Sequence, residues 1–465
     1  MKKPSARSLT LISGRTIRSA ALLLALGLLV GASASPPPQA SAPTFTKDIA
    51  PLLFKSCTPC HRPGEVAPFS LVTYQDTRKR AAMLVAVTQQ RVMPPWKPQP
   101  GHGEFAQARH LSEAEVSLLS RWVKAGTPEG SPRDLPALPT FPMGWKLGPP
   151  DLILKAPQSF SIPAEGSDIY QHLIFSLGAP KERYLRAIEI RPGNRRVVHH
   201  AVGILDTSGK ARELDAKTPE PGYRGMGGTG FLPAGFTPGY APGQVPGWFP
   251  EDAAIVLPKG GDFVLQLHYH PSGKPETDQS EVGLYFTDKK PTRNSNILLL
   301  GSSDIDIRAG DAAYRVSDQF KLPVDVTVNN IWGHMHFIGK DMRVWAELPG
   351  GKIQRLLWIN DWDFNWQDTY TYQKPIRLPA GTVVRAEFTF DNSAKNPRNP
   401  SSPPRRILIG EASTDEMAGL VIGVETSDPL SNLGLLAANF GHYLEMESKG
   451  SRANAEAEKA RKKSE

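Results

Sequence analysis

The chain has 465 residues, of which 40% are hydrophobic and 22% charged, and it contains 44 prolines and 41 glycines. This length is too great for one ordinary core and suggests about three domains, while the ordinary hydrophobic fraction excludes a disordered chain. The formal net charge of +8 does not indicate nucleic-acid binding, because the first 34 residues contain five basic and no acidic residues, so their removal leaves +3.

Residues 1–34 have the pattern of a secretory signal peptide. A basic region precedes an apolar run at residues 20–30, and the small residues Ala32, Ser33 and Ala34 follow. The apolar run is short for a membrane span, with an uncleaved anchor as the alternative. We therefore expect a periplasmic or secreted mature protein without a transmembrane span.

The chain has two cysteines, and both lie in the sequence Cys57-Thr58-Pro59-Cys60-His61. This spacing is the attachment signature of c-type haem: two thiols add to the vinyl groups of one porphyrin edge, and the adjacent histidine ligates the iron. The alternatives are a redox dithiol and half of a zinc site. A second cysteine pair and a surrounding βαβ pattern are both missing from the sequence, which favours covalent haem c.

The flanks of this motif predict a small all-α domain at residues 43–126. We expect one helix capped by Thr46, a second at residues 76–90, and a third with a capping box of Ser112 and Glu115 that stops at Gly126. The segment resembles the small cytochrome c domains found at the head of many bacterial multidomain exported proteins.

Met93, which precedes two prolines, is the predicted sixth ligand of the haem iron, because a thioether raises the haem potential. Met83, His102 and His110 are alternative ligands, and a five-coordinate iron is a further alternative.

A proline-rich linker at residues 127–150 separates this domain from a region of strands. Short strand-like segments follow at 169–175, 184–190, 196–205, 263–269, 282–286, 296–300, 324–344, 383–390 and 420–424. Such spacing is typical of β-sandwiches, and we expect two of them, at residues 151–295 and 296–443. Residues 444–465 form a charged tail, either a frayed helix or disordered.

Six of the eleven histidines lie in three tight pairs, namely His199 with His200, His268 with His270, and His334 with His336. Alternate residues of a strand share a face, so His334 and His336 can offer two imidazoles to one ion. Adjacent residues face opposite ways, so His199 and His200 can share an ion only if the strand is bulged or turned there. Imidazole suits zinc, copper, iron and nickel. Solvated histidines, or a structural module that binds zinc, are the alternatives.

The order of these motifs resembles one known family. His199-His200 is followed by Leu265-Gln266-Leu267-His268-Tyr269, by His334-Met335-His336 with Gly339-Lys340, and by Ser413-Thr414-Asp415-Glu416-Met417, with the turn Leu257-Pro258-Lys259-Gly260 before the third histidine. Residues 151–443 thereby resemble the copper type II, ascorbate-dependent monooxygenases, the family of the peptidylglycine α-hydroxylating and dopamine β-monooxygenases.

The resemblance implies two copper ions held on two jelly-roll-like sandwiches. The electron-supplying copper would be held on the first by His199, His200 and His268, and the oxygen-binding copper on the second by His334, His336 and Met417. His270 has no counterpart in the family pattern, and we interpret it as a surface or second-shell histidine.

The chain departs from the family in two ways. Eukaryotic members are stapled by disulfides, whereas both cysteines here belong to the haem motif. Peptide-hydroxylating members bind the substrate carboxylate through Arg, Asn and Tyr, at positions that are Trp332, Gly419 and Val421 in this chain. A small, more apolar substrate is therefore expected.

Together these patterns predict an exported haem- and copper-containing monooxygenase that hydroxylates a C–H bond with O₂. Electrons would enter through the haem, from a quinol-linked donor, another cytochrome or a small reductant, and pass to the His199, His200 and His268 copper. The alternative is a periplasmic copper-binding or electron-transfer protein without hydroxylase activity.

Overall fold

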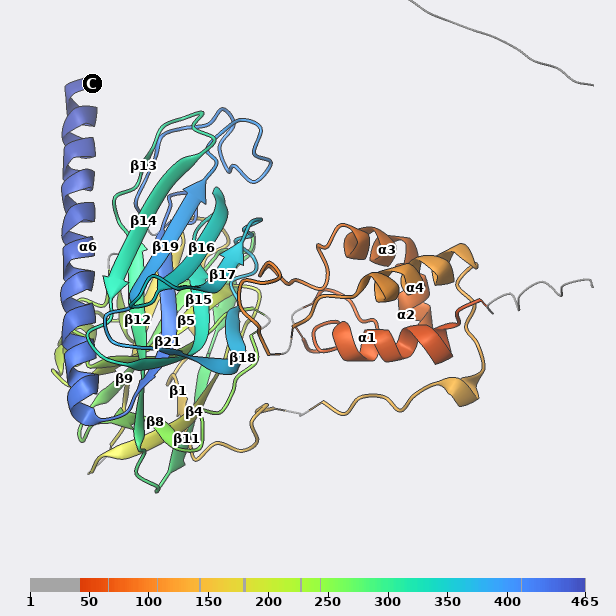
Figure 1. Cartoon of the computed structure of the whole chain (residues 1–465), viewed down its shortest axis with the longest axis horizontal. Helices are drawn as coiled ribbons and strands as arrows, with labels where there is room; N and C mark the ends of the chain where they lie inside the picture. Colours follow the sequence, from red (N-terminus) through yellow and green to blue (C-terminus); the bar gives the residue numbers. More distant parts are fainter. Residues whose placement is uncertain are drawn as a thin grey trace, which may run out of the picture. The chain divides into compact units, whose positions relative to one another are not determined.

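The computed structural model describes residues 42–464, apart from residues 66, 107, 142–143, 179–180, 226–227, 243 and 411. The predicted signal peptide at residues 1–34 lies outside this part. Strands arranged in several sheets dominate the described residues, and helices are few (Figure 1). The expectation of a mostly β protein built as a sandwich is therefore confirmed. Within the described ranges no helix has the length and apolar character needed to cross a membrane.

The first part of the chain is helical. Its elements are η1 (Phe45–Ile49), α1 (Ala50–Ser56), α2 (Tyr74–Arg78), α3 (Ala81–Gln89) and α4 (Glu113–Lys124), followed by η2 (Pro132–Asp134). They enclose a small core that includes the buried side chains of Leu53, Leu119 and Trp122. The predicted capping box is confirmed, because Ser112 and Glu115 each accept the other's backbone N–H.

Two details predicted for these helices are wrong. Thr44, not Thr46, precedes the first helical turn, and its N–H donates to the carboxylate of Asp48 at 2.8 Å. The helix expected at residues 76–90 is two helices, because Arg80 leaves the helical conformation between α2 and α3.

The first sandwich contains the strands from Leu152 to Thr287. They are β1 (Leu152–Lys155), β2 (Phe160–Ile162), β3 (Ile169–Ser176), β4 (Arg183–Arg191), β5 (Val198–Asp206), β6 (Tyr223–Arg224), β7 (Gly235–Tyr240), β8 (Ala253–Leu257), β9 (Asp262–Tyr269), β10 (Glu276–Asp278) and β11 (Glu281–Thr287), with the short helix α5 (Lys210–Asp215) after β5. A sheet of order β6-β3-β9-β5-β7 packs against β1-β11-β4-β8 around side chains such as Leu185, Phe263 and Leu284.

The second sandwich contains the strands from Arg293 to Thr426. They are β12 (Arg293–Ser302), β13 (Asp306–Ile307), β14 (Tyr314–Lys321), β15 (Val326–His334), β16 (Gly339–Glu347), β17 (Ile353–Ile359), β18 (Thr369–Leu378), β19 (Val383–Phe390), β20 (Ile407–Leu408) and β21 (Ala418–Thr426). A sheet of order β14-β19-β16-β17 packs against β12-β21-β15-β18 around side chains such as Leu298, Phe388 and Ile422.

The two sandwiches share one sheet. β8 pairs in parallel with β12 through Arg293 opposite Ala253 and Asn294 opposite Ala254, which joins their strands into one eight-stranded sheet. β12 begins at Arg293 and so crosses the predicted domain boundary between residues 295 and 296. The boundaries themselves stay a prediction.

One predicted strand is wrong. The segment expected to be extended at residues 324–344 is two strands, β15 and β16, separated by a turn at residues 335–338. The backbone N–H of Ile338 in this turn donates to the buried carboxylate of Glu416 at 2.8 Å, so a side chain replaces the sheet partner that a continuous strand would need.

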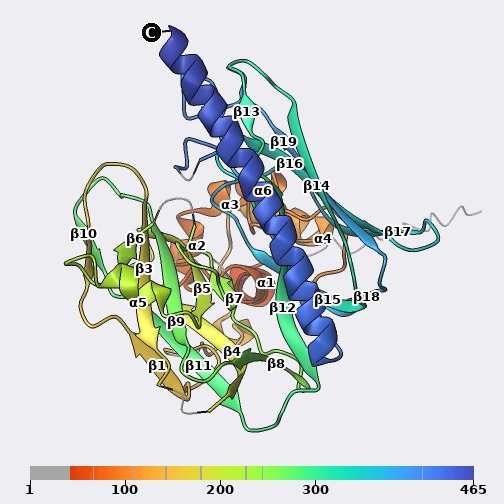
Figure 2. The ribbon, with the colours of Figure 1, turned by 90° about the vertical axis from the view of Figure 1, so that its left-hand side faces the viewer.

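The helix α6 (Pro429–Ser464) lies along β12 and β14 (Figures 1 and 2). The side chain of Asn439 accepts the N–H of Leu299 at 2.9 Å and donates to its carbonyl at 3.0 Å. His442 lies 2.8 Å from the carboxylate of Asp318 on β14. The residues predicted as a charged tail continue this helix to Ser464.

The loop between α3 and α4, the described residues of 94–109, packs on β17 and β18, and we call it the strap. Phe105 is 4% exposed and belongs to the core of the second sandwich, where its ring lies against Trp96. The N–H of Ala106 donates to the carbonyl of Thr371 at 2.7 Å. A segment that interrupts the helical part therefore completes the core of a β-sandwich.

Candidate metal centre

Three of the predicted ligands, His199, His200 and His268, meet on the first sandwich. His199 and His200 lie on β5, and His268 lies on the neighbouring strand β9. The register of β5 against β9 shifts between Val198 and His200, so His199 is the extra residue of a bulge. This confirms the prediction that the backbone must be irregular for two adjacent histidines to face one site.

The three rings converge through their Nδ1 atoms. Nδ1 of His200 lies 3.2 Å from Nδ1 of His199 and 3.3 Å from Nδ1 of His268. Nε2 of His268 lies 3.2 Å from a carboxylate oxygen of Asp168, which can only accept a proton, so Nδ1 of His268 keeps its lone pair. Three nitrogens within 4.8 Å of one another can hold one metal ion.

His334 and His336 come together on the second sandwich, but not in the way expected. His334 is the last residue of β15, whereas His336 lies in the turn that follows, so the two do not share the face of a strand. Their ring centroids are nevertheless 5.0 Å apart.

Both of these rings offer Nε2. Nδ1 of His336 lies 3.2 Å from the carbonyl of Asp415 and must donate to it, and the buried Nε2 of His336 has no protein partner. Nδ1 of His334 lies 2.5 Å from Oε1 of Gln367, whose amide is oriented by its own donation to the carbonyl of Phe364. A buried Nε2 lone pair without a partner fits a metal ligand.

Met417 lies beside this pair, just before β21. Gly419 is the register partner of His334, and Met417 precedes it by two residues on the same face if the extended backbone continues. The carboxylate of Glu416 accepts the N–H groups of His336 at 2.9 Å and Met417 at 3.2 Å. One buried side chain thus fixes the backbone of two predicted ligands, while ligation by the Met417 sulfur stays a prediction.

The two groups of histidines adjoin each other. The rings of His200 and His334 have centroids 5.6 Å apart. Phe364 stacks on His199 at 4.2 Å and meets the edge of His336 at 5.8 Å. Five imidazoles therefore form one continuous cluster, which we call the histidine cluster and whose two halves belong to different sandwiches.

Burial favours the neutral form of four of these rings, those of His199, His200, His334 and His336. It lowers the pKa of His199 to about 3 and that of His334 to about 4, and it moves the pKa values of His200 and His336 well below the usual range. The proximity of the other histidines lowers the pKa of His199, His200 and His336 further. Neutral imidazole is the form that binds metals, so the cluster is ready to receive a cation at neutral pH.

The donor set suits a soft or borderline metal. The histidine cluster supplies five nitrogens, and Met417 would add a thioether, which favours copper in its reduced state. The nitrogens alone would also accept zinc. The residues present therefore fit copper.

Asp168, which sequence reasoning missed, contacts residues of both halves. Its carboxylate lies near His268 and 2.7 Å from Nδ1 of His270, and it accepts the backbone N–H of Ser413 at 3.0 Å. Burial alone would raise the pKa of Asp168, but hydrogen bonds from His268, His270 and Ser413 outweigh burial and lower it. His270 is exposed and bonds this carboxylate, as expected of a second-shell histidine.

The haem motif follows directly from α1. The carbonyl of Cys57 accepts the N–H groups of Cys60 at 3.1 Å and His61 at 2.8 Å, so the motif forms one compact turn. Nδ1 of His61 lies 3.1 Å from the carbonyl of Phe69, which leaves Nε2 as the nitrogen with a lone pair. An iron ligand needs that tautomer.

The predicted sixth ligand stays a prediction. Met93 is half-buried in the loop after α3, and its N–H donates to the carbonyl of Val87 at 3.1 Å. Of the alternatives, Met83 and His110 are exposed, and the ring of His102 lies against Trp358 on β17.

Among the ion pairs that connect the helical part and the strap with the sandwiches, two lie near the histidine cluster. Glu65, shortly after the haem motif, binds Arg195 at 2.6 Å, four residues before His199. Arg109 of the strap pairs with Asp368, which adjoins the Gln367 that bonds His334. Each predicted half of the histidine cluster is therefore within a few residues of an ion pair to the helical part.

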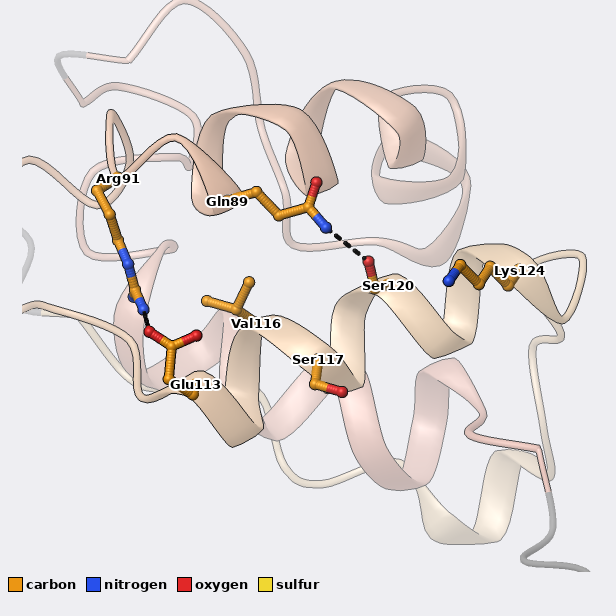
Figure 3. Close-up of a pocket in the computed structure, with 7 residues that line it drawn as sticks. All are labelled: Gln89, Arg91, Glu113, Val116, Ser117, Ser120 and Lys124. Atoms are coloured by element: carbon orange, nitrogen blue, oxygen red, sulfur yellow. Dashed lines mark hydrogen bonds and ion pairs between the residues drawn. The ribbon is translucent and has the colours of Figure 1, made fainter. Parts of the chain in front are cut away.

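A surface hollow lies between α3 and α4 (Figure 3). Gln89 and Ser120 bridge it at 3.1 Å, and Arg91 pairs with Glu113 at one end, as the dashed lines in Figure 3 show. None of the predicted haem or metal ligands lines this hollow, so it plays no part in the site.

The comparisons with known proteins assign no family. No family model matches the chain. The major capsid protein P2 of bacteriophage PM2 is similar over 56% of this chain and 97% of its own, with 11% identity and a TM-score of 0.22. The VP2 subviral particle of infectious bursal disease virus is similar over 60% of this chain and 74% of its own, with 9% identity and a TM-score of 0.17.

Proposed function

We propose that the protein is an exported copper-dependent monooxygenase that hydroxylates a C–H bond of a small apolar substrate with O₂, with electrons supplied through an N-terminal cytochrome c domain. The reaction consumes O₂, two electrons and two protons, and it yields the alcohol and water. The observation that carries the proposal is the histidine cluster: four buried imidazoles and the half-buried His199, from two sandwiches, with ring nitrogens that face each other or, at Nε2 of His336, lack a protein partner.

Each residue has a defined task in this proposal. His199, His200 and His268 would bind copper through Nδ1, and His334 and His336 through Nε2 with the Met417 sulfur. Three acceptors favour protonation of the ring nitrogen that faces away from the metal. The carbonyl of Asp415 does so at Nδ1 of His336, and the amide oxygen of Gln367 at Nδ1 of His334. The carboxylate of Asp168 does so at Nε2 of His268. Bound copper would supply O₂ activation and one-electron transfer.

The surroundings of the cluster support an apolar substrate. Trp332 stacks on His334 at 5.5 Å and donates its indole N–H to the carbonyl of Gln367 at 3.0 Å. Phe364 is buried against His199. Large aromatic rings exclude water and offer no cation to a carboxylate, which agrees with the loss of the family's carboxylate-binding side chains at Trp332, Gly419 and Val421.

The cysteine environment supports haem attachment over a redox dithiol. Burial raises the pKa of the Cys57 thiol to about 12 and also raises that of Cys60. Reactive dithiols need a lowered pKa, because the thiolate is the nucleophile. A haem bound at Cys57, Cys60 and His61 would supply one-electron transfer, and the strap and the ion pair of Glu65 with Arg195 would hold this domain against the copper module.

A periplasmic copper-binding or electron-transfer protein is the second candidate. It is favoured by the 5.6 Å separation of the His200 and His334 rings, which leaves no room for a substrate between them in this arrangement. Such a protein would bind copper and exchange electrons with the haem, but it would not consume O₂ for hydroxylation.

The test is metal and redox stoichiometry on protein matured in the periplasm. We expect two coppers per haem, and haem that is reduced anaerobically should be reoxidised on mixing with O₂. His334→Ala and Met417→Ala should abolish this reoxidation, whereas His442→Gln, which changes a histidine of α6 outside the cluster, should not. Copper binding with reoxidation that is indifferent to His334→Ala would favour the second candidate, and protein without copper would contradict both.

A further inference from the structure

We propose that Asp168 is a positioning residue shared by both halves of the metal centre, which orients His268 in one half and anchors the loop that carries Met417 in the other. This inference rests on the proposed copper function and adds a residue that none of the sequence motifs contains. Asp168 directly precedes β3, far from both halves in sequence.

The first contact is with a ligand of the half formed by His199, His200 and His268, which we call the Nδ1 half because these rings face each other through Nδ1. Oδ2 of Asp168 lies 3.2 Å from Nε2 of His268, and Nδ1 on the other side of that ring faces His200 at 3.3 Å. The approach of this carboxylate favours the tautomer of His268 that carries its proton on Nε2 and restricts the orientation of the ring, although the contact is not a well-directed hydrogen bond in this arrangement. The face of His268 is also held, because Tyr170 stacks on it at 4.3 Å.

The second contact is with the loop of the other half. Ser413 donates both its backbone N–H, at 3.0 Å, and its hydroxyl to Oδ2 of Asp168. Ser413 begins the turn that leads to Glu416 and Met417. The same oxygen that faces His268 therefore anchors the segment that carries Met417 and whose Asp415 carbonyl and Glu416 carboxylate accept hydrogen bonds from His336.

The burial of Asp168 shows that these contacts are structural rather than incidental. Its side chain is 6% exposed, and both oxygens are used, since Oδ1 receives Nδ1 of His270 at 2.7 Å. A buried carboxylate is costly unless its acceptor positions are filled. Asp168 meets that condition only when the β9 strand of the first sandwich and the Ser413 loop of the second are both in place.

Asp168→Asn tests the first role. Asparagine keeps the shape of the side chain, but it replaces one of the two acceptor oxygens with an NH₂ group that donates hydrogen bonds. The probe is Cu(I), titrated into protein matured in the periplasm against a competing chelator. We expect the affinity of the Nδ1 half to fall about 10- to 100-fold, the usual effect of losing such a partner. The matched control is Asp206→Asn, a buried aspartate at the far end of β5 that accepts hydrogen bonds from Ser208 and Ala211.

The shared role is tested in a His268→Ala background, where the Nδ1 half is disabled and the remaining copper is bound by His334, His336 and Met417. Adding Asp168→Asn there should weaken this remaining copper several-fold and alter its Cu(II) spectrum. If the second substitution has no further effect, Asp168 serves His268 alone and the shared role is refuted.

The outcome separates this inference from the proposed function. Wild-type protein that binds no copper would overturn the proposed function. Wild-type protein that binds copper, with Asp168→Asn and Asp206→Asn both unchanged in affinity, would overturn the role of Asp168 and leave the proposed function standing. An equal loss in both variants would show a general effect of buried aspartates and would also refute the specific role.

Discussion

Glu416 illustrates how one side chain can organise a turn. It is fully buried, and burial raises its pKa to about 8 even though the backbone N–H groups of His336, Ile338 and Met417 oppose that shift. The N–H groups of His336 and Ile338 have no strand partner, because β15 ends at His334. The carboxylate therefore replaces the missing sheet partner in the turn between β15 and β16.

We expect Glu416→Ala to reduce the free energy of unfolding of metal-free protein by about 2–4 kcal/mol, since buried N–H donors would lose their acceptor. Glu416→Gln keeps one acceptor oxygen and should cost less. Urea denaturation measures both. Glu113→Ala, at an exposed ion pair on α4, should change the stability by less than about 0.5 kcal/mol. An equal effect of Glu416→Ala and Glu113→Ala would contradict this account.

At the scale of elements, α6 is joined to the second sandwich by polar side chains. His442 bonds Asp318, whose Oδ2 also accepts the N–H of Gly301 on β12 at 2.8 Å. The hydrogen bond that His442 donates to the carboxylate of Asp318 raises the pKa of His442. The protonated ring therefore stabilises the docked helix.

This shift predicts a pH dependence. Because the pKa of His442 is raised on folding, its contribution is fully present below the unfolded value of about 6.5 and is lost as the pH rises through the folded value. The contribution should be below about 1 kcal/mol, as the pair is partly solvated. The difference in free energy of unfolding between wild type and His442→Gln should shrink between about pH 6 and pH 9. Asp318→Asn should remove that trend, and a difference that is constant with pH would argue against it.

Sequence patterns that span a few residues predicted the elements that depend on neighbouring residues alone. The capping box of α4 and the strands β3, β4, β9 and β19 follow from spacing and alternation within a few residues. β14 was missed although Tyr314, Val316 and Phe320 alternate, because Asp318 interrupts the alternation and only Phe320 is buried. The break between β15 and β16 was missed because it depends on Glu416, about 80 residues away.

At the scale of the whole molecule, the two sandwiches are joined by Arg293. Its guanidinium pairs with Asp252 at the start of β8 and with Glu425 on β21, and the side chain of Glu425 is fully buried. The eight-stranded sheet shared by the two sandwiches is also joined at Arg293, where β12 pairs with β8. Both sandwiches should therefore unfold together.

We expect wild-type protein to show one denaturation transition, with tryptophan fluorescence and far-ultraviolet circular dichroism coinciding. Arg293→Met should cost about 3–5 kcal/mol, because it leaves Glu425 buried without its cation. Arg377→Met removes an exposed pair with Asp325 and should be nearly neutral. If the two variants are equally stable, Arg293 does not join the sandwiches.

Sequence patterns indicated which histidines form the cluster better than they indicated its arrangement. The three histidine pairs and the bulge at His199 could be foreseen, because each depends on residues no more than two positions apart in the sequence. The meeting of His200 with His334, and the role of Asp168, could not, since Asp168 and Ser413 are 245 residues apart and no periodicity connects them. Such contacts arise only when two sandwiches pack together.

The strap also limits how the protein can be divided. Because Phe105 and Trp96 precede α4, a shortened chain that starts at the linker would lack two aromatic side chains of the second sandwich and would have a large cavity beside Tyr370 and Tyr372. A protease cut within the linker of the intact protein would instead leave two fragments that remain associated. We therefore expect that exchanging the N-terminal helices for those of another protein succeeds only when residues 94–109 are kept.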